Sequence, residues 1–333
     1  MGDSEIQQQL FQAIKSKLTS DKSVAEEVAA LLEISTDSAY RRMRGEKTVT
    51  FDELYKIATH FRLSIDQLMN LDTGAFMFQG QLLDKKTFRF EEYMTSLLRN
   101  LAYMNSFKEK VFYYSCKDLP VFYHYVFREL AAFKWFFWLK TYFNFPEFEG
   151  KKFRFSDYPD ELFAIDHEVL NQYNQLPSVE IWNMESMSIL FRQIEFYRDC
   201  RVFESDKDAL KLYEAVDKLW DHLEKQASLG YKFSYGDPGE KPTGNFRMYF
   251  NEVQLGDNNM LAVLDGTKIS YISHTTINFM LTRDMTFNEN MYSHLQNLIK
   301  RSTLISAVSE KERAKFFRII RERIERRKEA LKV

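Results

Sequence analysis

The sequence predicts a mainly α-helical protein of the α+β class. It has a five-helix bundle at the amino end, then an aromatic-rich helical region, and a small antiparallel β-meander near the carboxyl end. Its 11 Gly and 6 Pro make 17 in 333 residues, whereas average usage of about 7% and about 5% gives roughly 40. Tight turns are therefore scarce and long helices are expected. Hydrophobic residues form 45% of the chain, enough for more than one core, and the length suggests two or three domains.

Residues 1–72 carry closely spaced helix start signals. In a capping box, a Ser or Thr side chain accepts from the backbone N–H three residues later, and the side chain at that later position reaches back. The three such pairs are Ser23 with Glu26, Thr50 with Glu53, and Ser64 with Gln67. The expected short helices cover 5–18, 24–32, 36–44, 51–61 and 65–71. Residues 73–89 follow as the expected linker.

Residues 90–235 form an aromatic-rich region with a helical periodicity near 3.6. One strand is expected at Val111–Ser115, before the break at Pro120. Between Tyr103 and Phe163 there are 22 Phe, Tyr and Trp residues, and a helix that is apolar all round is normally buried. This block is therefore interpreted as hydrophobic core. The alternatives are a pocket for an apolar or planar effector and a membrane-interface surface.

The last region, residues 245–333, changes character after a loop at Gly236–Gly244. The Asp265-Gly266 pair is a strong hairpin signal. It lies among three strand-like runs that predict a three-stranded meander: Phe246–Val253, Met260–Leu264 and Lys268–Ile272. Helices follow the meander. Together with residues 90–235, this region is expected to dimerise and to sense a signal.

The final helix is strongly basic and begins with a capping pair, Ser309 and Glu312. From Lys311 to Val333 the chain holds 10 basic and 4 acidic residues. An apolar stripe runs along it at Phe317, Ile320, Ile324 and Leu331. Such a helix either docks on a partner protomer or on DNA phosphates, or lies solvated on the surface with local ion pairs. The solvated helix is the favoured interpretation.

Charge and cysteine usage exclude several classes of protein. The 46 Lys and Arg against 48 Asp and Glu give a net charge of −2. This value argues neither for a protein that binds nucleic acid through a large positive charge nor for an acidic tail. Cys116 and Cys200 are too few for a disulfide framework, so both are interpreted as core thiols in a reducing compartment. No secretory signal or membrane span is expected, which predicts a cytoplasmic protein.

Catalytic and metal-binding motifs are not found in the sequence. The six histidines are scattered without an HxxxH pair, and neither a Gly-rich phosphate loop nor a GxSxG elbow occurs. The run Cys116-Lys117-Asp118 offers a thiol, a base and an acid, but the end of a strand before Pro120 explains it better. The sequence therefore predicts no enzyme, no metal and no cofactor.

One segment, Ser23 to Leu68, has a spacing with a specific meaning. Ala29 supplies a small side chain where two helices approach, Ile34 plugs the turn, Ser35 caps the next helix and Gly45 ends it. The apolar side of the remaining helices comes from Leu54, Ile57, Ala58, Leu63, Ile65 and Leu68. Without a gap, this segment resembles the helix-turn-helix of phage Cro and repressor proteins, the XRE family of bacterial regulators.

The resemblance implies that the helix at about 36–44 binds DNA. In the family this helix enters the major groove, where its amino-terminal residues face base edges while neighbouring turns grip phosphates. Base-reading positions fall on Thr36, Asp37, Tyr40 and Arg41, phosphate positions fall on Arg44 and Lys47, and Ser38 and Arg42 complete the candidate DNA-binding residues. Arg41 is suited to donate twice to a guanine, and Asp37 to accept from a cytosine amino group.

Three positions depart from the family pattern. Glu33 stands where the turn usually has Gly, and Ala25 stands where the motif often begins with Gln. Arg42 occupies an inward slot that is usually aliphatic. Either the stem of Arg42 passes the core and its head meets a phosphate, or the helix is rotated so that Ala39 and Met43 pack inward.

The sequence as a whole predicts a sequence-specific transcriptional regulator that binds double-stranded DNA. Because one small motif contacts few bases, whereas two held about 34 Å apart read both halves of a palindrome, a homodimer is expected. A small-molecule or peptide effector would change operator affinity by favouring one dimer arrangement. The alternatives are a DNA-targeted enzyme or defence effector with its chemistry in residues 90–302, and a protein-interaction scaffold.

Overall fold

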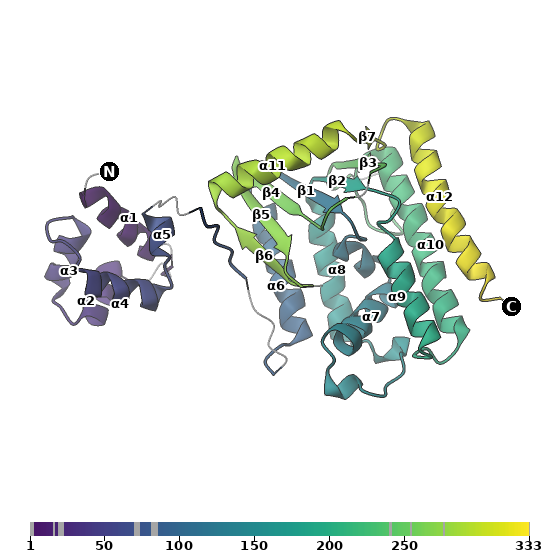
Figure 1. The fold of residues 1–333 in the computed structure, drawn as a ribbon, viewed down its shortest axis with the longest axis horizontal. Coiled ribbons are helices and arrows are strands. Elements are labelled where there is room, and N and C mark those ends of the chain that lie inside the picture. Colours follow the sequence, from purple (N-terminus) through teal and green to yellow (C-terminus); the bar gives the residue numbers. More distant parts are fainter. Residues whose placement is uncertain are drawn as a thin grey trace. The chain divides into compact units, whose positions relative to one another are not determined.

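The computed structural model describes residues 3–15, 17–18, 23–69, 74–80, 86–239, 242–253, 255–275 and 277–332. The chain forms two compact units, one ending at Ala75 and the other beginning at Phe76 (Figure 1). Each unit has a hydrophobic core of its own, so each is described by itself. None of the described helices is both long enough and apolar enough to cross a membrane.

The smaller unit is a bundle of short helices, and the five helices expected from the sequence are confirmed. They are α1 (Asp3–Lys15), α2 (Val24–Leu32), α3 (Thr36–Met43), α4 (Phe51–Phe61) and α5 (Ile65–Leu68). Apolar side chains one helical turn apart face inward, Leu10 and Ile14 from α1 and Val28 and Leu32 from α2. The unit thus folds from local signals, as its sequence predicts.

The predicted capping boxes of this unit have different outcomes. The pair Thr50 and Glu53 forms both halves of the box at the start of α4. Ser23 precedes α2 with an extended backbone, but its side chain makes no cap hydrogen bond to the described helix, so that prediction is wrong. The box at Ser64 cannot be compared, because the side chain of Gln67 lies outside the described residues.

The larger unit is built on one mixed sheet, which has seven strands within the described residues. Their order across the sheet is β6-β5-β4-β1-β2-β3-β7. The bounds are β1 Lys110–Cys116, β2 Ser178–Trp182, β3 Phe246–Phe250, β4 Met260–Leu264, β5 Thr267–Ser273, β6 Phe279–Thr282 and β7 Thr303–Leu304. Strands β1, β2 and β3 are parallel to one another, and every other pairing is antiparallel.

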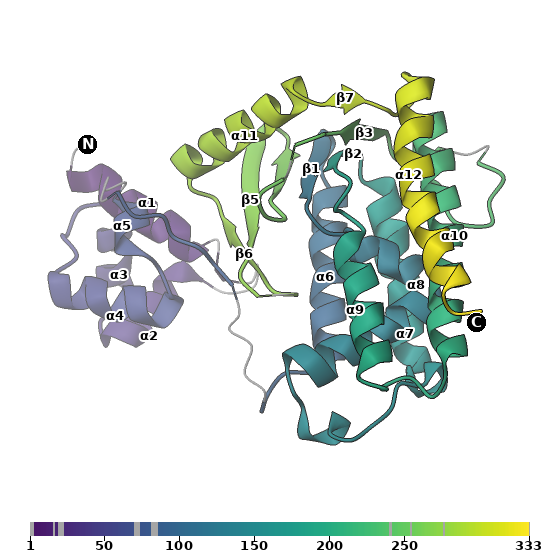
Figure 2. The ribbon, with the colours of Figure 1, turned by 45° about the vertical axis from the view of Figure 1, so that its right-hand side comes forward.

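Helices cover both faces of this sheet (Figures 1 and 2). One face carries α6 (Phe90–Asn105), α7 (Arg128–Phe137), α8 (Asp160–Gln175), α9 (Ser188–Asp199), α10 (Asp206–Leu229) and α12 (Glu310–Glu329). The other face is covered by α11 (Met285–Lys300), whose Leu295 packs with Val179 and Ile181 of β2. The helices between β1, β2 and β3 share one face because crossovers between parallel strands have one hand.

The sheet confirms one predicted strand and corrects the predicted meander. Strand β1 contains the expected Val111–Ser115. A three-stranded antiparallel meander exists, but it is β4, β5 and β6; the run beginning at Phe246 forms β3, which pairs with β2 and β7 on the other side of the sheet. Strand β2 was expected to be helical. It is buried along its whole length, so it shows no alternation of polar and apolar residues.

The aromatic block lies in the core of the larger unit, as predicted. Phe133, Phe136, Phe137 and Trp138 are buried, in α7 and in the π-helical turn η2 (Trp138–Tyr142) that continues it. The remaining short helices here are η1 (Val121–Val126), η3 (Pro146–Phe148) and η4 (Phe155–Asp157). Cys116 is buried as expected, but Cys200 is exposed, so its prediction as a core thiol is wrong.

The basic helix α12 packs on α10, and the predicted apolar stripe along it is buried at Phe317, Ile320 and Ile324. Its cations meet acidic side chains of the same unit. Arg321 pairs with Asp221 and Glu224 at 2.6 and 2.8 Å, Lys328 with Asp217 at 2.9 Å, and Arg327 with Glu195 at 2.7 Å. Much of its basic charge is therefore balanced within the chain.

Residues of the predicted linker 73–89 belong partly to the larger unit. Gln79 forms an antiparallel bridge with Leu281 of β6 through two backbone hydrogen bonds, 2.7 and 2.8 Å long. The rings of Phe76 and Phe78 meet the ring of Phe287 edge to face. The chain leaving the smaller unit thus adds a short extended piece to this sheet edge.

Candidate nucleic-acid interface

Helices α2 and α3 of the smaller unit are joined by a tight turn. Glu33 has a left-handed backbone with φ of 57°, and its N–H donates to the carbonyl of Ala29. The N–H of Ile34 donates to the same carbonyl at 3.0 Å. A left-handed backbone costs roughly 1–2 kcal/mol in a residue other than Gly. Glu33 therefore keeps the turn that Gly usually makes, at some cost in stability.

The turn leaves α3 with two distinct faces. Ala39 and Arg42 point into the unit, with 0% and 2% exposure, while Met43 is half-buried. The predicted base-reading residues Thr36, Asp37, Tyr40 and Arg41 and the predicted phosphate ligands Arg44 and Lys47 are exposed. The sequence left two arrangements open for this helix, and the structure has features of both. Ala39 packs inward, as expected for a rotated helix, and Arg42 also stays inside.

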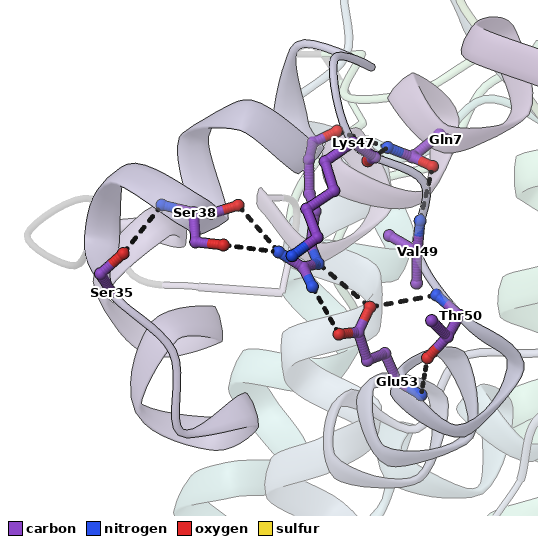
Figure 3. Close-up of polar contacts among 8 residues, drawn as sticks. Gln7, Ser35, Ser38, Lys47, Val49, Thr50 and Glu53 are labelled. Atoms are coloured by element: carbon purple, nitrogen blue, oxygen red, sulfur yellow. Dashed lines mark hydrogen bonds and ion pairs between the residues drawn. The ribbon is translucent and has the colours of Figure 1, made fainter.

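Arg42, one of the candidate DNA-binding residues, is buried and does not belong to the exposed set. Its guanidinium donates from Nε and Nη2 to the two carboxylate oxygens of Glu53, at 3.0 and 2.6 Å. It also donates from Nη1 to the carbonyl and hydroxyl of Ser38, at 3.1 and 2.8 Å (Figure 3). With its side chain 3% exposed, Arg42 holds α3 against the start of α4 through Glu53.

Glu53 links this cluster to the next helix. One oxygen of its carboxylate accepts from the N–H of Thr50 at 3.0 Å, and its own N–H donates to the Thr50 hydroxyl at 3.3 Å (Figure 3). The hydrogen bond from Arg42 lowers the pKa of Glu53 below its usual range against the opposing effect of burial. A single carboxylate therefore caps α4 and holds α3 against it.

Ser38 lies on the inner edge of α3 and completes the cluster. Its hydroxyl accepts from Arg42, and its N–H donates to the side chain of Ser35 at 3.2 Å. Ser35 is the predicted cap of α3, and this bond confirms it. Ser38 is half-buried. It lies next to the exposed face and helps to hold Arg42 in place.

Gln7 of α1 is a positioning residue that the sequence analysis missed. Its amide nitrogen donates to the carbonyls of Arg42 and Lys47 at 2.6 and 2.8 Å. Its amide oxygen accepts from the N–H of Val49 at 3.0 Å (Figure 3). Three adjacent glutamines stand here, but only Gln7 lies one turn before Phe11 on the buried side of α1. Helical spacing could therefore have found it.

The exposed cations of the interface are linked by one acidic residue. Glu46 pairs with Arg44 at 2.6 Å and with Arg41 at 3.7 Å, and all three side chains are about half exposed. The hydrogen bond from Arg44 lowers the pKa of Glu46. Solvent screens these exposed ion pairs, so they contribute little to stability.

These features define a helix-turn-helix unit. It has a tight turn, a second helix whose inner side is fixed by hydrogen bonds, and an exposed outer face that is polar and basic. Residues 3–84 match the family model of the BetR domain, a domain associated with DNA-binding regulators of the helix-turn-helix type. The match covers all five helices of the smaller unit. No curated protein and no solved structure matches the chain.

Proposed function

We propose that this chain is a sequence-specific transcriptional regulator of the XRE type that reads an operator with the outer face of α3. The main support for the proposal is that the two faces of this helix differ. Arg42 and Ala39 hold it from inside, whereas Thr36, Asp37, Tyr40 and Arg41 are exposed and have no place in the core. The proposal includes no catalytic step.

Each exposed side chain suits a contact with DNA. Arg41 donates two parallel hydrogen bonds to a guanine, and Asp37 accepts from a cytosine amino group. Tyr40 meets a thymine methyl group or a phosphate. Arg44 and Lys47, on the turn after α3, bind backbone phosphates, where they supply affinity without reading sequence.

The regulator acts as a homodimer in the bacterial cytoplasm. One copy of α3 reads only a few base pairs, so two copies about one helical turn of DNA apart are needed for an operator of useful length. The larger unit supplies the dimer contact and binds an effector. An effector bound there changes operator affinity only through its different affinity for the arrangements of the dimer.

The test is selection of bound sites from random duplex DNA by the full-length protein, repeated with Arg41→Ala. An enriched inverted repeat in which the substitution blurs one base pair per half-site supports both the dimer and the assignment of α3. Arg62→Ala is a matched control, because Arg62 is exposed at the end of α4. An absence of any enriched sequence would contradict the proposal.

A further inference from the structure

The larger unit contains a small cavity at the carboxyl end of β1. Its volume is about 40 Å³, and its walls come from α6, the segment after β1, α7 with η2, and the end of the β4-β5-β6 meander. One buried water needs roughly 10–15 Å³, so the cavity has room for about three water-sized groups. The two oxygens of a carboxylate and one ammonium group match that number.

Three polar atoms on residues lining this cavity have no hydrogen-bond partner among the described residues. They are the hydroxyl of Tyr93, Nε2 of His124 and Nε1 of Trp138. His124 and Trp138 are 1% and 3% exposed. Buried polar atoms are nearly always hydrogen-bonded, so three open ones around one cavity indicate a site for an external polar group.

Two charged residues, Lys134 and Asp118, line the same cavity. The Lys134 ammonium donates to Gln193 at 2.8 Å and lies 5.3 Å from the Trp138 ring, which leaves it further donors. One oxygen of Asp118 accepts from the N–H of Leu119 at 2.8 Å. Burial lowers the pKa of Lys134 and raises that of Asp118, while each charge opposes this change in the other. The formal charges sum to zero, which favours a ligand head without net charge.

A groove of about 510 Å³ lies beside the cavity, lined by residues of α6 and β6 and of the segments next to them. Tyr93, Ile277 and Phe279 line both spaces. Leu97 and Leu281 add further apolar wall to the groove. Polar and charged residues, among them Arg89, Glu92 and Asn100, line the rest of the groove. A concave space with an apolar wall and convergent polar groups is typical of small-molecule sites.

We propose that cavity and groove form one binding site for a free α-amino acid with an apolar side chain. Its carboxylate accepts from Lys134, Trp138 Nε1 and the Tyr93 hydroxyl. Its ammonium donates to Asp118 and to His124 Nε2. His124 Nδ1 lies 3.2 Å from the Val121 carbonyl, so Nδ1 carries the proton and Nε2 is an acceptor.

The apolar side chain lies in the groove, which also reaches the segment leading from the smaller unit. Gln79 and Gly80 line the groove beside β6, and Gln79 is the residue bridged to Leu281. An amino acid bound against this segment favours its paired state, and so limits the free length of chain before the DNA-binding unit. This regulatory consequence rests on the proposed function, whereas the binding site does not.

Calorimetric titration of the full-length protein, without DNA, tests the site with L-phenylalanine and L-leucine. We expect one amino acid per chain. The analogues 3-phenylpropionate and phenethylamine, each lacking one charged group of phenylalanine, should bind at least about tenfold more weakly. No binding of either amino acid at about 10 mM, far above a millimolar Kd, would overturn the proposal, as would equal affinity for the analogues.

Matched variants separate binding from folding. Tyr93→Phe removes a hydroxyl that has no partner among the described residues, so the free protein should keep its stability while its Kd for phenylalanine rises about three- to tenfold. The control is Tyr125→Phe, whose hydroxyl donates to Met94 Sδ at 3.3 Å and which does not line the cavity. Unchanged affinity in Tyr93→Phe, or equal losses in both variants, would overturn the site.

A second matched pair lies on one helical stretch. Trp138→Phe removes an N–H without a partner in the part of the chain that the structure describes, and it should weaken binding. Trp135→Phe should not, because Trp135 packs on Phe148 and Tyr158 and does not line the cavity. A crystal structure grown with phenylalanine that shows only ordered water at the three open atoms would also overturn the proposal. Because no DNA is present in these experiments, their failure is distinct from failure of operator binding.

Discussion

In the smaller unit the Arg42 guanidinium donates four hydrogen bonds, all to Glu53 and Ser38. In the larger unit the cavity at the end of β1 has equally buried polar atoms, but His124 Nε2 and Trp138 Nε1 have no partner among the described residues. Both regions bury polar groups at a cost in desolvation. A closed network, in which every polar atom has a partner, fixes the position of a helix. An open network, in which some polar atoms lack one, keeps hydrogen-bonding capacity for a ligand.

A second closed network in the larger unit supports this distinction. Glu180 of β2 is fully buried, and its carboxylate accepts from Tyr123, Tyr173, Ser178 and Trp182. Its neighbourhood includes the buried Lys232, whose ammonium donates to two backbone carbonyls. The Glu180 carboxylate thus has four donors in the surrounding fold, so this cluster stabilises the fold in the manner of Arg42.

Removing Glu53 from the hydrogen-bond network of the smaller unit should cause the largest loss of stability. Glu53→Ala leaves the Arg42 guanidinium buried without its carboxylate, and we expect α3 and α4 to lose about 3 kcal/mol of stability, the low end for a broken buried pair because Glu53 is partly exposed. Hydrogen exchange of peptides from these helices measures it. Glu46→Ala, which breaks only exposed pairs, should leave the stability of these helices nearly unchanged. Equal losses in the two variants would contradict the comparison.

The network around Lys232 should make stability depend on pH. Burial lowers the pKa of Lys232 to about 7 from 10.5, although Glu180 and Cys116 favour its charged form. Between these values the unfolded chain binds more protons than the folded one. Stability of the larger unit should therefore rise with pH from about 7 to about 9, by at most about 1.4 kcal/mol per pH unit.

The urea midpoint of the larger unit, measured across this pH window, checks the sign. Lys232→Met removes the titrating group while keeping an unbranched apolar stem. The variant should lose stability overall, because the carbonyls of Tyr173 and Leu176 lose their donor. It should also show a flatter pH profile than the parent chain. A parent midpoint that falls as the pH rises through the window would refute this account of Lys232.

Substitutions on the outer face of α3 should alter DNA binding without altering stability. Arg41→Ala should relax the preference at one base pair and cost about 1–3 kcal/mol of specific binding. Arg44→Ala or Lys47→Ala should instead weaken binding to all sequences and reduce the salt dependence by about one phosphate. Fluorescence anisotropy at several salt concentrations separates the two classes. Identical salt slopes and identical base preferences in all three variants would argue against the assigned roles.

The smallest expected effect is at the turn. Glu33→Gly should relieve the left-handed strain and raise the stability of the smaller unit by about 0.5 kcal/mol, since greater freedom of Gly in the unfolded chain offsets part of the gain. Glu33→Ala keeps a Cβ and should give no such gain. A chemical denaturation series of the two variants tests this. A gain in the alanine variant would place the effect in the side chain of Glu33.

The smaller unit could be predicted from sequence because its signals are local. Start residues such as Ser35 and Thr50 and apolar spacing within each helix determine its five helices. The role of Arg42 could not be predicted, because its partner Glu53 lies on the next helix, and a sequence does not show which side chains meet across that gap. Gln7 lay within reach of prediction through its spacing to the apolar residues of α1.

In the larger unit, prediction failed for strands whose place in the sheet depends on partners far away in the sequence. Strand β2 is buried throughout and lacks alternation, and β3 was assigned to the wrong neighbours because hairpin signals describe only adjacent strands. The cavity brings Tyr93 and Phe279, nearly 190 positions apart in the chain, to one wall. No local pattern marks such a site, and only the fold assembles it.

On our proposal, the outer face of α3 reads DNA while Arg42 and Ala39 fix its inner face. A thermodynamic cycle between Arg41→Ala and each base pair of the selected operator tests it most directly. We predict a coupling of about 1–3 kcal/mol at one base pair in each half-site and none at the others. A coupling spread evenly over the operator, or absent from it, would contradict the claim.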